Sequence, residues 1–402
     1  MSTIYSTPRG NTYDPMPIEL WHWDGTGAVG RLETSEEIEV TWADRGAGTA
    51  TIDTPLNDLS RLLLDADGGV LVVATLNGKR HVSTVVESDT TADSEARSDV
   101  RVQATTASAW SMLDGQRIPP VPDRPLSQQE SAEEYVLTGP VETVVKRLVT
   151  IGAERLGHPI AVLEDRGLGP TVTVRSRMDT TADLVTAALA GTGYRLSLEA
   201  WLPGDERIGD LSLTRPTIIA DVVAYRERPG LVLSGVSEDL ESWSLTHTRA
   251  STTRVIVGDK GEGTEQKFAA VAAESPGLSP WARREGYTST SSEEETPADV
   301  GAAELAEAAA TAEMEATAAP SQSWEFGDDG LYPRQYDVGD WCTLDLQEIG
   351  EVQEVITEVT VKLTPVSLTV TPKVGTPDTK SRDLYALVTD LSKRVDRQKR
   401  GR

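Results

Sequence analysis

The clearest candidate for chemistry in this sequence is a glycine-rich stretch, VIVGDKGEGTEQKF, over residues 255–268. Three glycines and a lysine follow a β-branched run, which is how a phosphate-binding loop begins. A P-loop needs its lysine after the last glycine and before a Ser or Thr that opens a helix, so that the ammonium group reaches the terminal phosphates. Here Lys260 precedes Gly261, and the carboxylates of Glu262 and Glu265 would repel a phosphate. The stretch is therefore predicted to be a strand that ends in a turn.

Other residue types used in catalysis do not form a pattern. The four histidines lie one per segment, and no pair has the spacing that places two imidazoles on one metal ion. The segment SGVSE lacks the second glycine of a nucleophile elbow. Cys342 is the only cysteine, so no intrachain disulfide can form, and its apolar strand context is typical of a small buried hydrophobe. The sequence predicts no catalytic residue, no metal site, no cofactor and no enzyme.

One aromatic cluster, Trp21-His22-Trp23, could stack on a sugar. In the interpretation that we prefer, one Trp turns inward and the other lies at a protein contact.

The chain is strongly acidic. It has 64 Asp and Glu residues against 38 Lys and Arg residues, a formal net charge of −26. A surface of this sign repels the phosphate backbone, which disfavours a protein that sequesters nucleic acid and suits a surface that DNA passes without binding. The last eleven residues, SKRVDRQKRGR, reverse the sign with six basic residues and one acidic residue.

A β-rich block comes first among the elements that must position these residues. Residues 37–42 alternate apolar and polar side chains, as a half-buried strand does, and Thr49–Thr54 predicts a second strand. A short helix is predicted in NDLSRLLLDADGG, and Asn77-Gly78 marks the tip of a hairpin. With one more strand in SDVRVQATTASAWSML, this order predicts a small barrel over residues 16–114.

The periodicity then changes to that of an α/β domain. A proline-rich linker leads into an amphipathic helix, whose apolar stripe is Val141, Val144, Val145, Leu148 and Val149. Thr180 and Asp183 form a capping box that opens a second helix, which is predicted to end at Leu189. Strands are predicted in TVTVRSRM and YRLSLEAWL.

β-Patterns resume in TIIADVVAYRE and continue to the run VQEVITEVTVKLTPVSLTVTP, with an Ala/Glu-rich helix over Asp299–Ala319 between them. The predicted fold is mainly β with α+β parts: two β-barrels, an intervening small α/β domain, a helical insertion and a short C-terminal helix. The predicted boundaries are 1–15 for an N-terminal arm, 16–114 for the first barrel, 115–127 for the linker, 128–205 for the α/β domain, 206–265 with 324–374 for the second barrel, 266–323 for the insertion and 380–402 for the basic helix.

The C-terminal segment supplies the candidate contact residues. Apolar residues at 4-3-4 spacing form an a/d seam that could close a trimer: Leu384, Val388, Leu391 and Val395. Basic residues follow that could contact a partner: Lys393, Arg394, Arg397, Lys399 and Arg400. Two heptads are too few to be stable alone, so a helix docked on the body or frayed remains the alternative.

Several of these stretches together resemble one family. EEIEVTWADRGAGTATIDTP with its helix and hairpin, TRVIVGDKGEGTEQKF, the Ala/Glu-rich helix and YPRQYDVGDWCTL resemble the tail-tip hub proteins of siphophages. These are minor tail proteins of actinobacterial phages, Tal-like and related in fold to the baseplate hubs of contractile tails. The resemblance spans about residues 16–375.

The resemblance implies a homotrimer in the virion, at the distal end of the tail. The two barrels of each subunit would resemble tube-protein domains, so three subunits would present six barrels to a six-fold ring and enclose a DNA channel. It implies contacts with the distal ring and tube proteins, a downstream tip or fibre protein and the tape-measure protein, but no specific DNA binding. The chain would be made in the host cytoplasm and would not insert into a membrane, since no long apolar span is present.

Many Tal-type proteins continue into a peptidase or fibre region, whereas this sequence stops at Arg402. Cell-wall digestion and receptor binding are therefore expected in other tip proteins. Two alternatives of other classes stay open: a tail-associated cell-wall hydrolase that uses a carboxylate pair, and a carbohydrate-binding adhesin that uses exposed Trp side chains.

Overall fold

The computed structural model describes residues 16–32, 37–64, 69–92, 100–234, 243–248, 254–258, 268–272, 285–289, 321–326, 332–346 and 350–375 of the chain. Strands predominate over helices, so the mainly β fold class is confirmed. The chain divides into a larger unit, Met1–Leu245 with Ser323–Pro377, and a smaller unit, Thr246–Gln322 with Asp378–Arg402. Each unit is described by itself.

The first β block of the larger unit contains seven strands and one short 3-10 helix. They are β1 (Ile18–His22), β2 (Ala28–Leu32), β3 (Glu37–Ala43), β4 (Thr49–Pro55), η1 (Ser60–Leu64), β5 (Val70–Leu76), β6 (Lys79–Ala92) and β7 (Val100–Ser108). The strands are hydrogen-bonded in the order β3-β4-β7-β6-β5-β1-β2. The predicted strand at 37–42 and the short helix are confirmed. The pair β1 and β2 is an addition that the sequence patterns did not indicate.

Alternation of side chains sets the buried face of this block. Ile38, Val40 and Trp42 of β3 are buried, whereas Glu37 and Glu39 between them are exposed. This is the period of two expected of a strand with one face on a core. The predicted hairpin at Asn77-Gly78 is confirmed, because β5 and β6 pair directly across these two residues.

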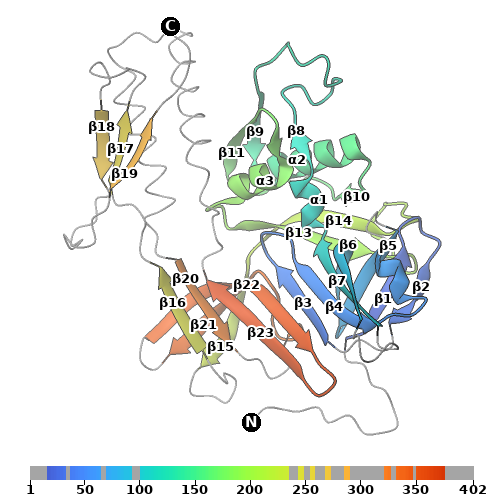
Figure 1. Ribbon diagram of the computed structural model, residues 1–402. Coiled ribbons are helices and arrows are strands. Elements are labelled where there is room, and N and C mark those ends of the chain that lie inside the picture. The colour runs from blue at the N-terminus through green and yellow to red at the C-terminus, as the bar shows by residue number, and fades with distance from the viewer. Residues whose placement is uncertain are drawn as a thin grey trace. The chain divides into compact units, whose positions relative to one another are not determined.

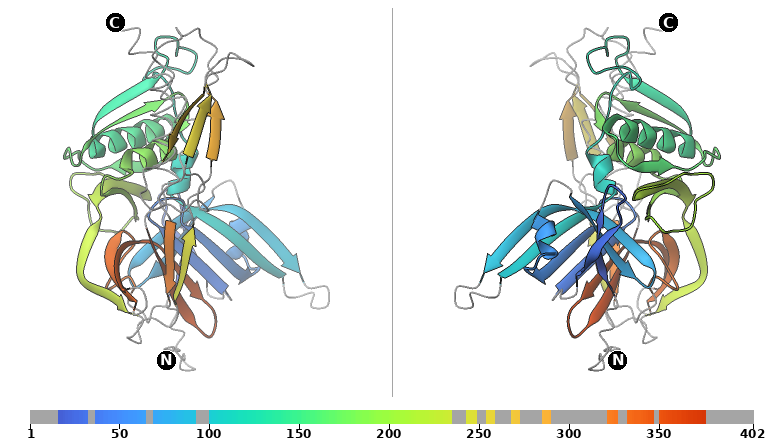
Figure 2. Two further views of the ribbon diagram at one scale, coloured as in Figure 1. Left: turned by 90° about the vertical axis from the view of Figure 1, so that its left-hand side faces the viewer. Right: turned by 90° about the vertical axis from the view of Figure 1, so that its right-hand side faces the viewer.

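A second group of strands extends the same sheet. It contains β15 (Arg226–Ser234), β21 (Asp340–Leu346), β22 (Gly350–Leu363) and β23 (Leu368–Gly375). Two further strands, β16 (Trp243–Thr248) and β20 (Ser321–Phe326), each span the boundary between the units. β22 pairs antiparallel with β3, from Glu358 opposite Ala43 to Leu363 opposite Ile38. Figure 1 shows β22 and β23 in orange to red beside the blue β3, and Figure 2 gives two further views of them. One continuous sheet therefore joins the two β-rich blocks.

One apolar core lies under both blocks. Trp42 of the first block contacts the ring of Tyr332 at a centroid distance of 5.6 Å, and Tyr332 contacts Tyr336 at 5.5 Å. Val359 and Val361 of β22 are fully buried in the same cluster. The two blocks are therefore packed as well as hydrogen-bonded to each other.

The α/β part lies between the blocks in the sequence. Its elements are α1 (Trp110–Asp114), β8 (Arg117–Ile118), β9 (Tyr135–Pro140), α2 (Val141–Leu156), β10 (Ile160–Val162), β11 (Thr171–Ser176), β12 (Asp179–Thr180), α3 (Thr181–Leu189), β13 (Tyr194–Trp201) and β14 (Thr217–Ala224). The apolar stripe of α2 is buried, as predicted. The Thr180 hydroxyl accepts the Asp183 N–H at 3.0 Å, which confirms the predicted cap of α3.

The strand over residues 217–224 lies in this α/β part. The sequence boundary at 206 places it in the second barrel, but β14 pairs in parallel with β10 and antiparallel with β13. Its side chains are buried on both faces from Thr217 to Ala220, as is usual for a central strand. Sequence position does not reveal which sheet such a strand joins.

The smaller unit holds a three-stranded sheet within its described residues. β17 (Arg254–Gly258) pairs antiparallel with β18 (Phe268–Ala272) and in parallel with β19 (Glu285–Ser289). β17 holds the start of the glycine-rich stretch and ends at Gly258, opposite Phe268 of β18. The predicted strand is confirmed, although it lies in this small sheet, and the predicted turn lies outside the described residues.

The predicted helix over 299–319 and the C-terminal segment 380–402 lie outside the described residues. The two barrels and the other domain boundaries stay predictions.

Candidate functional site: a charged cleft in the larger unit

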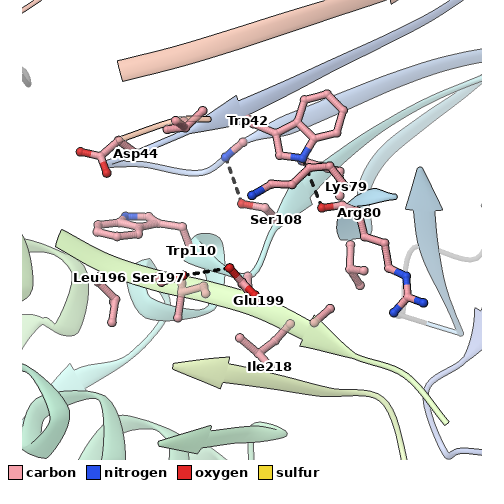
Figure 3. Close-up of a pocket in the computed structure, with 18 of the residues that line it drawn as sticks. Trp42, Asp44, Lys79, Arg80, Ser108, Trp110, Leu196, Ser197, Glu199 and Ile218 are labelled. Atoms are coloured by element: carbon pink, nitrogen blue, oxygen red, sulfur yellow. Dashed lines mark hydrogen bonds between the residues drawn. The ribbon is translucent and has the colours of Figure 1, made fainter. Parts of the chain in front are cut away.

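A cleft of about 280 Å³ lies in the larger unit, between the first β block and the sheet of the α/β part. Its lining comes from the end of β3, the start of β6, the start of α1 and the strand β13. Figure 3 shows Trp42 and Lys79 on one side of it and Ser197, Glu199 and Ile218 on the other. We refer to this space as the charged cleft.

Two tryptophans form its aromatic lining. Trp42 on β3 donates its indole N–H to the Arg80 carbonyl oxygen at 3.2 Å, which fixes the ring against the β5–β6 hairpin. Trp110 is the first residue of α1 and is 5% exposed. Both rings are held by packing, so the shape of the cleft is largely fixed.

Each cation that lines the charged cleft already has a carboxylate partner. Lys79 Nζ lies 2.7 Å from Asp337 Oδ2. The Arg80 guanidinium is bidentate on Asp205, with Nη2 at 2.8 Å from Oδ1. These two ion pairs hold the hairpin against neighbouring segments.

Asp44 lies at one end of the charged cleft and is 3% exposed. Its Oδ2 accepts the Tyr225 hydroxyl at 2.6 Å, and its Oδ1 lies 3.7 Å from Arg195 Nη1 without a hydrogen bond. Burial raises the pKa of Asp44, and Tyr225, Arg195 and Arg45 oppose this only in part. Arg195, the third cation that lines the cleft, is therefore matched by Asp44.

Glu199 is the exposed carboxylate of the charged cleft. Its only polar partner in the described part of the chain is the Ser197 hydroxyl, at a long 3.5 Å from Oε1, and it forms no ion pair there. With every lining cation already matched, Glu199 gives the cleft an excess of negative charge.

His81 is the buried histidine of this region. It is 4% exposed, it contacts Trp42 edge to face at 5.7 Å, and no side chain in the described residues hydrogen-bonds to its ring nitrogens. Burial lowers its pKa to about 4, so the imidazole is neutral at pH 7. Ser108 accepts the Gly48 N–H rather than pairing with His81. The described residues therefore place no nucleophile on this base, as covalent catalysis would require.

The other candidates from the sequence are dispersed. Cys342 is buried in β21, and burial, with Glu354 and Asp340, raises the pKa of its thiol to about 12. Trp21 is half-buried, whereas Trp23 is 54% exposed. The two tryptophans therefore differ in burial, as the interpretation with one Trp turned inward expects. The predicted seam and basic residues of 380–402 lie outside the described residues.

Sequence reasoning missed Asp44, Trp110 and Glu199 as members of one site. Each sits in an ordinary strand or helix pattern, and only the approach of β13 to the first block brings them together. The described residues contain no group of three or more His, Cys, Asp or Glu side chains that could hold a metal ion. No helix in the described ranges is long and apolar enough to cross a membrane.

Comparison with known proteins identifies the chain. Residues 17–376 match the family model described as Siphovirus ReqiPepy6 Gp37-like protein. No curated protein matches. Among solved structures, the 43 kDa tail protein of prophage MuSo2 from Shewanella oneidensis is similar over 90% of this chain and 97% of its own, with 14% identity and a TM-score of 0.55. The tail protein from Neisseria meningitidis MC58 is similar over 92% of this chain and 99% of its own, with 10% identity and a TM-score of 0.52.

The family match covers most of the chain, and the structural matches share its fold at low identity. The chain therefore belongs to the family of Siphovirus ReqiPepy6 Gp37-like proteins and has the fold of phage tail proteins.

Proposed function

We propose that the chain is the structural hub of the tail tip of a long non-contractile phage tail. Three copies form a ring that caps the distal end of the tail tube and adapts its six-fold symmetry to a three-fold tip. The ring lines the channel through which DNA leaves. The family match and the fold of tail proteins support this role.

The observation that carries the proposal is the β3–β22 ladder. It joins two β-rich blocks with six successive residue pairs, and both blocks share one buried core. A subunit that occupies two of six equivalent positions must hold two β modules at a fixed angle, because a flexible joint would let them lose register with the ring above. The continuous sheet provides that rigidity.

The charge of the chain agrees with a conduit. A net charge of −26 disfavours adhesion of DNA phosphates, which pass carboxylates more readily than lysines and arginines. The proposed partners are the distal ring and tube proteins, a downstream tip or fibre protein and the tape-measure protein.

The mass of the purified protein in solution tests the proposal. Native mass spectrometry and light scattering should give three times the chain mass, either for the protein alone or on addition of the purified distal ring protein. Electron microscopy of tails should then place three copies at the distal end. A chain that stays monomeric with the ring protein, or that lies elsewhere in the tail, would refute the hub.

A further inference from the structure

We propose that the charged cleft binds the side chain of one arginine, presented by a neighbouring polypeptide. This assignment goes beyond the hub role and does not depend on the number of copies in the ring. It rests on the volume, the charges and the aromatic lining of the cleft.

The volume fits one long side chain. At about 280 Å³ the cleft lies near the lower end of the range of roughly 300–1,000 Å³ for pockets that hold small molecules. It opens between two sheets whose facing side chains are held by ion pairs and packing. A rigid space of this size suits a single inserted group better than a folded segment.

The charges select a cation. Lys79, Arg80 and Arg195 lie beside Asp337, Asp205 and Asp44, which leaves Glu199 as the lining carboxylate without a counter-ion among the described residues. His81 adds no positive charge, since burial lowers its pKa to about 4. An anionic ligand would meet the Glu199 carboxylate without a free cation to compensate it.

The geometry favours a guanidinium over an ammonium group. The Glu199 carboxylate on β13 offers two oxygens to the cleft, and its one polar partner among the described residues is the Ser197 hydroxyl at 3.5 Å. A guanidinium carries five N–H donors in a planar fork and can serve more than one acceptor, whereas an ammonium is a compact point charge. Its plane also stacks on aromatic rings, and Trp42 and Trp110 line the space.

Capped single residues test the ligand class directly. We would titrate the full chain with N-acetyl-arginine amide by NMR or calorimetry and expect saturable binding with a dissociation constant of about 1 mM. The capped citrulline, a neutral analogue of the same shape, should bind at least tenfold more weakly. The capped lysine should bind more weakly than the arginine.

Two variants locate the site. Glu199→Gln should weaken the binding of capped arginine at least tenfold, because it removes the uncompensated charge. Glu206→Gln is the matched control, since Glu206 is an exposed carboxylate in the loop after β13 and does not line the cleft. It should leave the affinity unchanged. Both substitutions are at exposed positions, so both variants should fold.

A peptide distinguishes two sources of the arginine. A synthetic peptide with the sequence of residues 391–402 would bind more tightly than capped arginine if the C-terminal segment of another copy fills the cleft. Affinity no higher than that of capped arginine would point to a different tail protein. Either result supports an arginine site.

The inference is overturned by any of three outcomes. These are no saturation by capped arginine at about twenty times the expected dissociation constant, equal binding of capped citrulline, or unchanged affinity in Glu199→Gln. Binding of a neutral sugar in place of arginine would also overturn it and would favour the adhesin alternative. A failed titration would not affect the measured mass of the assembly, so the hub proposal is tested separately.

Discussion

Glu142 has no solvent-exposed surface, yet it lies one residue inside the start of α2 with four hydrogen bonds to its two oxygens. Oε1 accepts from Lys146 Nζ at 2.7 Å and from Arg166 Nε at 2.9 Å, and Oε2 accepts the N–H groups of Arg166 and Leu168. Burial alone would raise the pKa of Glu142. The hydrogen bonds from Lys146, Leu168 and Arg166 outweigh it and lower the pKa to about 2.

Glu142→Gln should therefore destabilise the protein. Loss of the carboxylate leaves Lys146 with only the Asp221 carboxylate as ion-pair partner, and breaking such a buried network costs about 3 kcal/mol in the free energy of unfolding. Urea unfolding at pH 7 would measure this, with the exposed Glu154→Gln on the same helix as the control.

The same group gives a pH dependence with a definite sign. Its folded pKa is depressed from about 4.5 to about 2, so its contribution is complete above pH 4.5 and is lost as the pH falls towards 2. The difference between the wild type and Glu142→Gln should shrink over that window. A difference that stays constant from pH 6 to pH 3 would show that the carboxylate charge is not what stabilises the fold.

Residue-scale features were the least predictable from sequence. Glu199 alternates along β13 as any solvent-facing side chain does, and nothing in that pattern reveals the first block opposite it. Glu142 occupies an acidic position in the first turn of a helix, which is a common surface preference, but the loop at 164–168 folds over it and buries it.

At the scale of elements, the predictions that depend on residues close to each other in sequence are confirmed. Asn77 and Gly78 both have positive φ, at 47° and 87°, which is the geometry of the two-residue hairpin turn that the dipeptide predicts. The predicted cap of α3 is confirmed for the same reason, since its donor and acceptor lie three residues apart. The sheet that β14 joins could not be predicted from sequence, because tertiary packing determines its partners, β10 and β13.

Gly78→Ala should destabilise the protein through backbone strain. A Cβ at this position would meet nothing within 4 Å, so the cost comes from φ alone and should be about 1 kcal/mol in the free energy of unfolding. Gly139→Ala in β9 is the control, because its φ lies outside the left-handed region and its nearest contact would be 3.9 Å away. Equal stability of the two variants by thermal unfolding would contradict the strain argument.

At the scale of the whole molecule, the two β blocks should unfold together. Val361 on β22 is fully buried in the shared core and lies opposite Val40 of β3. Val361→Ala should lower the free energy of unfolding by about 2 kcal/mol for both blocks. Hydrogen exchange should speed up equally in β4–β7 and in β22–β23.

The exposed Val366→Ala, in the turn between β22 and β23, should change neither exchange rate. Faster exchange confined to β22 and β23 in Val361→Ala would mean that the blocks are independent, and the rigid joint on which the hub rests would be lost.

The basic C-terminal segment gives a prediction about assembly. Deletion of residues 380–402 should leave the body folded and the number of copies in the assembly unchanged, but should weaken attachment of the downstream tip component. Because the proposed contact is between opposite charges, attachment in the wild type should weaken with salt, and its difference from the truncated protein should shrink as screening increases. Complete tails with normal infectivity from the truncated protein, counted by electron microscopy and plaque assay, would count against a contact role.

The β3–β22 ladder also has a consequence for synthesis on the ribosome. β3 is translated early, and its partner Glu358 follows Ala43 by 315 residues. At a translation rate of about 5–20 residues per second, β22 leaves the ribosome some 15 to 60 s after β3. One edge of β3 stays unpaired during that time. During that interval a strand from another nascent chain on the same message could pair with it, since an open edge accepts any extended backbone. The yield of correctly closed subunits should therefore depend on translation speed and on the spacing of ribosomes along the message.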